Sequence, residues 1–462
     1  MIGLVSTAVR QPAQDGGRPG WTLIVTSIGF VVVQLDITVA NVALPEIATE
    51  FGASTSGLQW IIDAYSLAFA TLLLTAGVAG DRFGSRRIFL AGLVVFGVAS
   101  LACGLAPSTS ILIAARIAQG IGGALILPTS LALIAHACGN DEAARIRMIS
   151  WWSASGALAV AAGPMIGGFI ISGLGWRPIF LINLPLCALG IWWTRTKIAE
   201  SATYVDGRFD VAGLITAALA LFMLTGTVIE AGARGWADPW VLAGFAAAAV
   251  VGIAFFKIEA ITAKPMLPLG LFRLPGFSTA AFVGTVISLT FFGLVFVLSL
   301  YFQQVRGYSP AMAGLAFLPL TAVIMLANIV GGQLGARVGF WPPMAGGMLI
   351  AAAGNGLLSF HRLDSAAPFL TIALGLFLIS IGTGVAAPAM MSAALAKVER
   401  TRSGTASAVL TTARQVGGAV GIALFGAFVA GGTQNIPSGG TLVFIVSAVL
   451  LLLGAGGAWL GR

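Results

Sequence analysis

The chain has 462 residues, of which 58% are hydrophobic and 9% are charged, and its net charge is +8. A soluble globular protein carries about 25% charged residues, so this composition excludes a water-facing surface and predicts lipid as the main solvent. The basic residues lie in short segments between apolar runs, without a stripe of basic and aromatic residues, so we expect no nucleic-acid binding.

Patterns typical of metal sites and of catalysis are absent from the sequence. The three cysteines form no CxxC pair and the two histidines lie far apart, which excludes a disulfide framework and a His-based site. There is no GxxxxGK[ST] loop to hydrolyse ATP. We therefore expect a protein that is not an enzyme and has no metal and no cofactor.

A helix needs roughly twenty apolar residues to span a bilayer, and the chain contains about fourteen such runs. They lie near 21–45, 57–79, 87–106, 110–135, 147–173, 178–194, 210–231, 238–257, 276–303, 310–335, 342–360, 366–395, 403–430 and 439–460. The runs are too long for barrel strands, so we expect an all-α integral membrane bundle of about 14 transmembrane helices.

Lysine and arginine alternate between the two sides of these expected spans. With both termini in the cytoplasm, eighteen of the 24 fall inside, four fall outside, and Arg116 and Arg414 fall within spans. Cytoplasmic loops of membrane proteins carry an excess of these residues. We therefore expect an even number of spans and cytoplasmic termini.

Glycine patterns of the first half return in the second half. The segment 80–84 resembles 335–339, and the Gly–Pro pair of 122–128 returns at 382–388. Repeated halves are common in transporters and place the substrate site near the midplane between them. We expect a cytoplasmic tail over 1–20, a six-helix half over 21–195, a loop and two inserted helices over 196–260, a loop over 261–275 and a second six-helix half over 276–462.

The first two expected spans each contain an acid. Asp36 lies deep in span 1, and a charge inside a span is costly and therefore a functional candidate. Burial favours the neutral carboxyl, so Asp36 can alternate between a proton and a cation; the alternative is a permanent ion pair that locks the helix. Asn41 belongs to a separate polar stripe of the same helix. Asp63, nearer the outer end of span 2, either lines an outward cavity or is a wetted helix end.

The segment 77–87 between spans 2 and 3 combines one acid with three arginines. Its residues of interest are Gly77, Asp81, Arg82, Gly84, Arg86 and Arg87. A basic loop fixes topology, but an Asp-Arg pair and a glycine are more specific than topology requires. We expect salt bridges or helix-end contacts that stabilise one conformation, and so a gating role.

Spans 4 and 13 each contain an arginine. Arg116 shares its helix face with Gln119 and stays charged with five donors, so it can hold a carbonyl or bias the proton affinity of a carboxylate. Arg414 is a possible site in the second half. Because Arg414 lies towards the cytoplasmic end of its span, snorkelling to the interface is an equal alternative.

Span 5 is rich in glycine around one proline. The set is Gly156, Gly163, Pro164, Gly167 and Gly168. Gly163 and Gly167 form a small-xxx-small contact, and Pro164 removes a backbone donor. The pattern predicts a tightly packed, bent helix.

Together these motifs resemble the major facilitator superfamily. Segment 77–87 is similar to its loop 2–3 signature, the span 4 run from Arg116 to its arginine motif, and 156–168 to its antiporter motif. Segment 35–45 resembles the span 1 motif of the fourteen-span drug:proton antiporters, and 176–185 and the run from Arg414 are similar to the same group. Parts of the second half, including 300–303 and 328–330, resemble methylenomycin-resistance exporters.

The resemblance implies proton-driven export of small, often lipophilic drugs or toxic metabolites across the bacterial cytoplasmic membrane. Asp36 and Arg116 would take proton-coupling roles, Asp81 and Arg82 a gating role, and Gly163-Pro164 an antiport role. The expected partners are the substrate, protons and the lipid bilayer, with a monomer as the unit. A proton-coupled importer and a non-transporting receptor or scaffold remain alternatives.

Overall fold

The computed structural model describes residues 19–139, 141–199, 210–262, 265–274, 276–360, 363–396, 398 and 403–460. Within these ranges the chain is helical and has no strand. The expected tail over 1–20 lies outside the described residues except for its last two, as do 200–209 of the expected loop and parts of the loop over 261–275.

The helices follow the order of the expected spans. They are α1 (Pro19–Phe51), α2 (Thr55–Phe83), α3 (Ser85–Gly104), α4 (Thr109–Cys138), α5 (Glu142–Leu174), α6 (Pro178–Leu181), α7 (Asn183–Lys197), α8 (Val211–Arg234), α9 (Pro239–Ile261), η1 (Leu269–Arg273), α10 (Phe277–Leu300), η2 (Tyr301–Val305), α11 (Pro310–Ala316), α12 (Leu318–Thr321), α13 (Ile324–Val338), α14 (Trp341–Ser359), α15 (Phe369–Leu395), α16 (Ser403–Phe428), η4 (Thr433–Asn435) and α17 (Ile436–Leu460).

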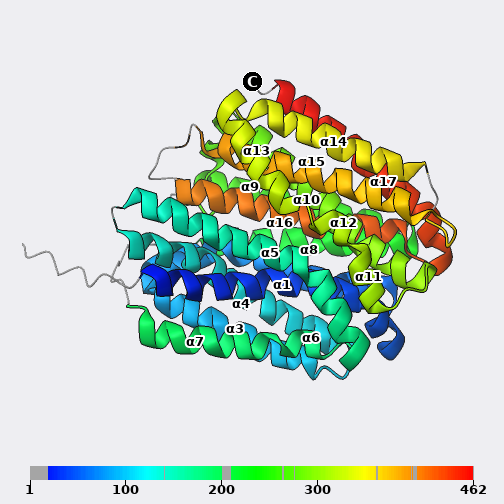
Figure 1. Ribbon diagram of the computed structural model, residues 1–462, viewed down its shortest axis with the longest axis horizontal. Helices are drawn as coiled ribbons and strands as arrows, with labels where there is room; N and C mark the ends of the chain where they lie inside the picture. Colours follow the sequence, from blue (N-terminus) through cyan, green and yellow to red (C-terminus); the bar gives the residue numbers. More distant parts are fainter. Residues whose placement is uncertain are drawn as a thin grey trace, which may run out of the picture.

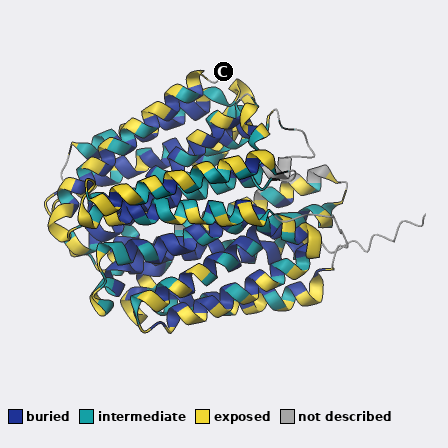
Figure 2. Cartoon of the chain, turned by 180° about the vertical axis from the view of Figure 1, so that it is seen from behind, coloured by how far each residue is buried: buried dark blue, intermediate teal, exposed yellow. Residues whose placement is uncertain are grey.

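The composition of these helices makes the chain an integral membrane protein. Twelve described helices are long and apolar enough to cross a membrane, and a bent pair within α5 raises the number to 13. The 19-residue helix α14, expected as a span over 342–360, is not among them, so the expected count of 14 is not confirmed. Exposed positions recur along the helices at the surface of the bundle (Figure 2). Large apolar residues are among them, including Trp240 at 77% and Leu370 at 81%. Such exposure is suited to lipid rather than water.

The helices pack as two groups with a hairpin between them. In the first group α4 packs against α2 and α3, and α1 packs against α5 and α7; in the second, α10 packs against α16, and α14 against α15 and α17. Figure 1 shows the helices side by side along the long axis, with α3 and α7 at one edge and α14 and α17 at the other. The hairpin α8–α9 reaches both groups through contacts of α8 with α2 and α16.

Two helix pairs make the most extensive contacts between the groups. α2 packs on α16, and α5 packs on α11. Gln59 Nε2 donates to the Ala423 carbonyl at 2.8 Å, and Gln303 Nε2 donates to the Val42 carbonyl at 2.9 Å. All these contacts lie towards the end of the bundle where α1 and α16 end, which is the expected outer side.

Several helix boundaries differ from the expected spans. α2 continues to Phe83 and α3 begins at Ser85, so Gly84 alone connects them, with a φ of +97° that favours glycine. The run 310–335 is broken into α11, α12 and α13, and Pro319 accounts for the first break because it has no backbone N–H to donate to Leu315. The bend predicted in span 5 is confirmed, since 147–160 and 162–174 meet at 41°.

Candidate functional site

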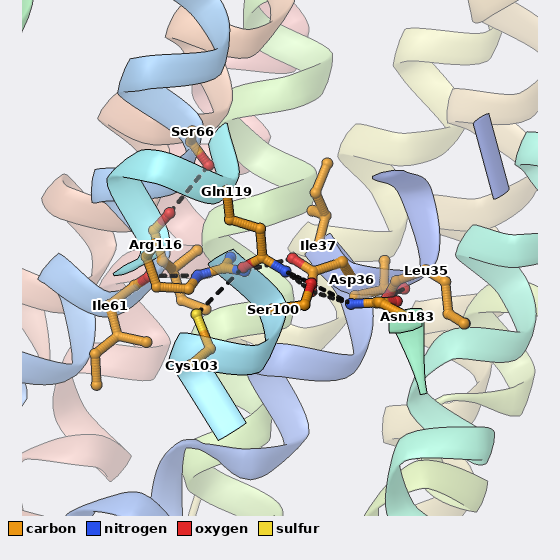
Figure 3. Close-up of polar contacts among 12 residues, drawn as sticks. Leu35, Asp36, Ile37, Ile61, Ser66, Ser100, Cys103, Arg116, Gln119 and Asn183 are labelled. Atoms are coloured by element: carbon orange, nitrogen blue, oxygen red, sulfur yellow. Dashed lines mark hydrogen bonds and ion pairs between the residues drawn. The ribbon is translucent and has the colours of Figure 1, made fainter. Parts of the chain in front are cut away.

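A polar network inside the first helix group surrounds Asp36, which is 3% exposed (Figure 3). Arg116 Nη1 from α4 forms an ion pair with Asp36 Oδ2. Gln119 Nε2 donates to Asp36 Oδ1 at 2.7 Å, and Asn183 Nδ2 from α7 donates to the same oxygen at 3.0 Å. Three donors from two other helices therefore hold the carboxylate in place.

Sequence reasoning brought Asp36, Arg116 and Gln119 forward but missed the α3 and α7 members of the network. The Ser100 hydroxyl accepts from Gln119 Nε2 at 2.9 Å and from Asn183 Nδ2 at 3.3 Å. Both Ser100 and Asn183 are fully buried. Their only signal in the sequence is a polar residue within an apolar run, since buried polar groups need partners.

Arg116 extends the network to α2. Its Nε donates to the Ile61 carbonyl at 3.0 Å, and its guanidinium carbon lies 4.4 Å from the centre of the Tyr65 ring. A methyl group at Gly120, one turn along α4, would overlap the Tyr65 carbonyl oxygen. One arginine therefore joins α1, α2 and α4. A change in the charge of Asp36 would alter the position of Arg116 and, through it, the contact with α2.

Asp63 lies on this stretch of α2, two residues beyond Ile61, but it is not part of the network. Its side chain is fully buried, and neither carboxylate oxygen has a hydrogen-bond partner among the described residues. In this conformation Asp63 is therefore neither a wetted helix end nor a residue that lines an open cavity. Burying a carboxyl group without a hydrogen-bond partner is costly, which makes Asp63 a functional candidate.

Asn41 also stays outside the network. Its Nδ2 donates to the Ile37 carbonyl of its own helix at 2.9 Å, and its Oδ1 has no partner among the described residues. Asn41 therefore stabilises α1 locally in this conformation and keeps one free acceptor.

The gating segment 77–87 is the end of α2, Gly84 and the first turn of α3. Arg86 donates to the carbonyls of Thr194, at 3.3 Å, and Arg195, at 3.0 Å, at the end of α7. Asp81 is exposed and has no hydrogen bond or ion pair with any described residue, while Arg82 and Arg87 are both engaged in interactions. The predicted salt bridge of Asp81 is thus not formed in this conformation.

Gly77 and Gly80 place this segment against α4. The nearest atom to a methyl group at Gly77 would be Pro128 Cβ at 3.8 Å, whereas one at Gly80 would meet Thr129 Cγ2 at 2.9 Å. Gly80 therefore sets the close approach of α2 and α4 just before Asp81.

The glycines of α5 serve two different neighbours. A methyl group at Gly156 would overlap Phe30, one at Gly163 would overlap Thr38, and one at Gly167 would lie 2.9 Å from Val39, all on α1. Gly168 instead meets the Pro310 carbonyl of α11 in the second group. The motif around Pro164 therefore packs α1 on one face and joins the two groups on the other.

A hollow of about 560 Å³ lies where α1 approaches η2 and η4. Its lining includes Glu46, Thr49, Gln303 and Tyr308, which come from both helix groups. Glu46 lies ten residues beyond Asp36 on α1, or about 15 Å along the helix. The hollow is open and would leave much of a bound molecule exposed.

The family model for the Major Facilitator Superfamily matches residues 26–422 and 280–462. The chain is 36% identical over 448 residues to the Methylenomycin A resistance protein of Streptomyces coelicolor, covering 96% of this chain and 93% of that protein. It is also 36% identical to the Tetracenomycin C resistance and export protein of Streptomyces glaucescens, covering 90% and 76%.

Solved structures share the fold at low sequence identity. A bacterial homologue of the human lysosomal transporter Spinster, in an inward-facing and unoccupied conformation, matches with a TM-score of 0.64 at 17% identity and covers 96% of both chains. A peptide transporter bound to sulfate matches with a TM-score of 0.70 at 15% identity, covering 95% of this chain and 93% of the other.

Proposed function

This chain belongs to the major facilitator superfamily, and we propose that it exports small, often lipophilic drugs or toxic metabolites across the bacterial cytoplasmic membrane in exchange for protons. Relatives named for resistance and export cover most of the chain, which supports the export of such compounds. The proposed partners are the substrate, protons and the bilayer, with a monomer as the transporting unit and both termini in the cytoplasm.

The observation that carries the proton coupling is the unpartnered carboxyl of Asp63. It is fully buried on α2, which packs directly on α16 of the other group. Gln59, one turn earlier, is bonded to the Ala423 carbonyl of α16. A movement of α2 against α16 would therefore change the access of water to Asp63, and with it the proton affinity of the carboxyl.

Asp36 and Arg116 supply the second part of the coupling mechanism. In this conformation Asp36 is ion-paired, and Arg116 fixes the carbonyl of Ile61 next to the Asp63 turn. A proton on Asp36 would remove the charge that holds Arg116 and would loosen α2. Proton entry from the outside would then accompany substrate release, and proton loss inside would reset the carrier.

The outer end of the bundle is closed by the contacts between the groups. Gln303 bonds to Val42, and α5 meets α11 at Gly168. Alternating access requires these contacts to separate when the space between the two helix groups opens to the outside. The hollow at Glu46 and Gln303 lies at this joint, and we place the exit of the substrate there.

The test is a resistance panel in an efflux-deficient host, followed by flux in proteoliposomes. Expression of the intact chain is expected to raise the tolerated concentration of at least one lipophilic drug, and efflux is expected to follow an imposed pH gradient. Efflux that ignores the gradient would overturn proton coupling. Uptake into cells without export would instead support an importer, and ligand binding without flux would support a receptor.

A further inference from the structure

Arg414 on α16 points away from the end of the bundle at which its helix begins. α10 and α16 run in the same direction, because Gly417 meets the carbonyl of Thr285 and Gly421 meets that of Leu289. The residues of α10 that the Arg414 side chain contacts therefore show in which direction it extends.

The stem of Arg414 passes Gly284, and its head reaches Ser288 one turn further along α10. A methyl group at Gly284 would lie 3.1 Å from Arg414 Cγ and 3.5 Å from Cδ, while Arg414 Nε donates to Ser288 Oγ at 3.4 Å. An arginine that snorkels to the nearer interface would extend the other way. The alternative of a snorkelling residue is therefore wrong in this conformation.

Arg414 forms no ion pair with an acid among the described residues. Residues 276–462 contain two acids, Asp364 and Glu399, and both lie between expected spans. Arg116, Arg177 and Arg234 form ion pairs with Asp36, Glu50 and Glu230, none of which lies in the second half. Arg116, the buried arginine of the first half, is by contrast paired with Asp36.

The head of Arg414 retains free donors. Beyond the bond from Nε to Ser288, its two terminal amino groups have no partner among the described residues. The residue is partly exposed, as are its neighbours from 411 to 416 on α16, so helix packing does not fully enclose this part of α16. A guanidinium stays charged and presents a planar fork that matches a carboxylate.

We propose that Arg414 is a substrate-recognition residue that binds the carboxylate of exported compounds. Ser288 holds Nε and orients the fork, and Gly284 leaves room for the stem of the side chain. The inference rests on the proposed export function, because it names the class of substrate: lipophilic compounds that carry one carboxylate. An apolar span environment would make this ion pair stronger than the same pair in water.

The test compares matched acids and amides on the purified full-length protein by equilibrium dialysis. The probes are benzoate, naphthoate and anthracene carboxylate, each with its neutral carboxamide. The wild type is expected to bind at least one carboxylate about tenfold more tightly than its amide. Arg414→Gln is expected to lower that ratio to about one, and Arg414→Lys to retain part of it because the charge remains.

Two further variants separate recognition from folding. Ser288→Ala keeps the charge but frees the head of Arg414, so a ratio between those of the wild type and Arg414→Gln is expected. Arg234→Gln removes one exposed positive charge that pairs with Glu230, and should leave the ratio unchanged. A wild type with no carboxylate preference or no carboxylate binding at all, or an unchanged ratio in Arg414→Gln, would overturn the assignment. Because binding is measured without flux, failure of the export proposal would appear separately, in the vesicle assay.

Discussion

Arg116 and Asp36 form an ion pair with almost no contact with solvent, since their side chains are 0% and 1% exposed. The pair joins α4 to α1 at the centre of the first helix group. Removing one partner of a buried pair leaves the other charge uncompensated, whereas removing both charges costs much less. The effects of the two substitutions on the free energy of unfolding should therefore not be additive.

Asp36→Asn should lower the free energy of unfolding by about 3–5 kcal/mol, because it leaves the Arg116 charge unpaired. The double variant Asp36→Asn with Arg116→Gln should recover most of this loss while remaining unable to couple transport to protons. Unfolding in mixed detergent and pH-driven flux in proteoliposomes give the two readouts. A double variant no more stable than Asp36→Asn would contradict the interpretation of the pair.

Asp63→Asn should abolish the coupling of transport to protons while leaving the stability of the fold nearly unchanged. The amide resembles the neutral carboxyl in shape, and the carboxyl has no partner to lose among the described residues, so unfolding should change by less than about 1 kcal/mol. Substrate efflux should nevertheless stop responding to a pH gradient. Asp364→Asn, which removes an acid from a loop, is the matched control and should respond as the wild type does. Full coupling in Asp63→Asn would exclude the residue from the proton path.

The sequence predicted the helical bundle and the first members of the site because both depend on local patterns. Long apolar runs define spans, and rare charges inside them mark Asp36, Asp63 and Arg116. The pairing of Asp36 and the isolation of Asp63 could not be predicted, since they depend on how α1, α2, α4 and α7 face one another. Asn183 was missed for the same reason.

Helix ends were less predictable than helix cores. The polar run 80–87 reads as a loop, yet all of it except Gly84 is helical, because charged side chains at a membrane interface can stay in water while the backbone remains helical. The direction of Arg414 likewise depends on the neighbouring helix α10, since the space at Gly284 determines where the stem can lie.

Asp81→Asn should impair transport without lowering stability. Asp81 has no hydrogen bond or ion pair with a described residue here, so this conformation should keep its stability. A conformation closed on the cytoplasmic side would lose the salt bridge expected between Asp81 and an arginine of segment 77–87. Asp141→Asn is the control on the same side, because asparagine caps α5 as well as the aspartate that accepts from the Ala144 N–H. Flux in vesicles and thermal unfolding in detergent provide the comparison. Unaltered transport in Asp81→Asn would leave the segment with a role in topology alone.

The contact between α5 and α11 leads to the sharpest prediction about conformational change. A methyl group at Gly168 would overlap the Pro310 carbonyl, and one at Gly314 would overlap the Pro164 carbonyl, so each backbone occupies the space beside the other glycine. Gly168→Ala and Gly314→Ala should therefore force the groups apart at the expected outer end. Each group should remain folded, because its own packing is unchanged.

The expected result is a shift towards an outward-open conformation, with flux reduced about tenfold or more if the barrier to closure rises by about 1.4 kcal/mol. Labelling of a single cysteine introduced at Thr49, which lines the hollow between the groups, should become faster in both variants. Gly173→Ala on the same helix is the control, since no atom lies within 4 Å of the added methyl group. Equal labelling and flux in all three variants would show that the α5–α11 contact does not hold the outer end closed.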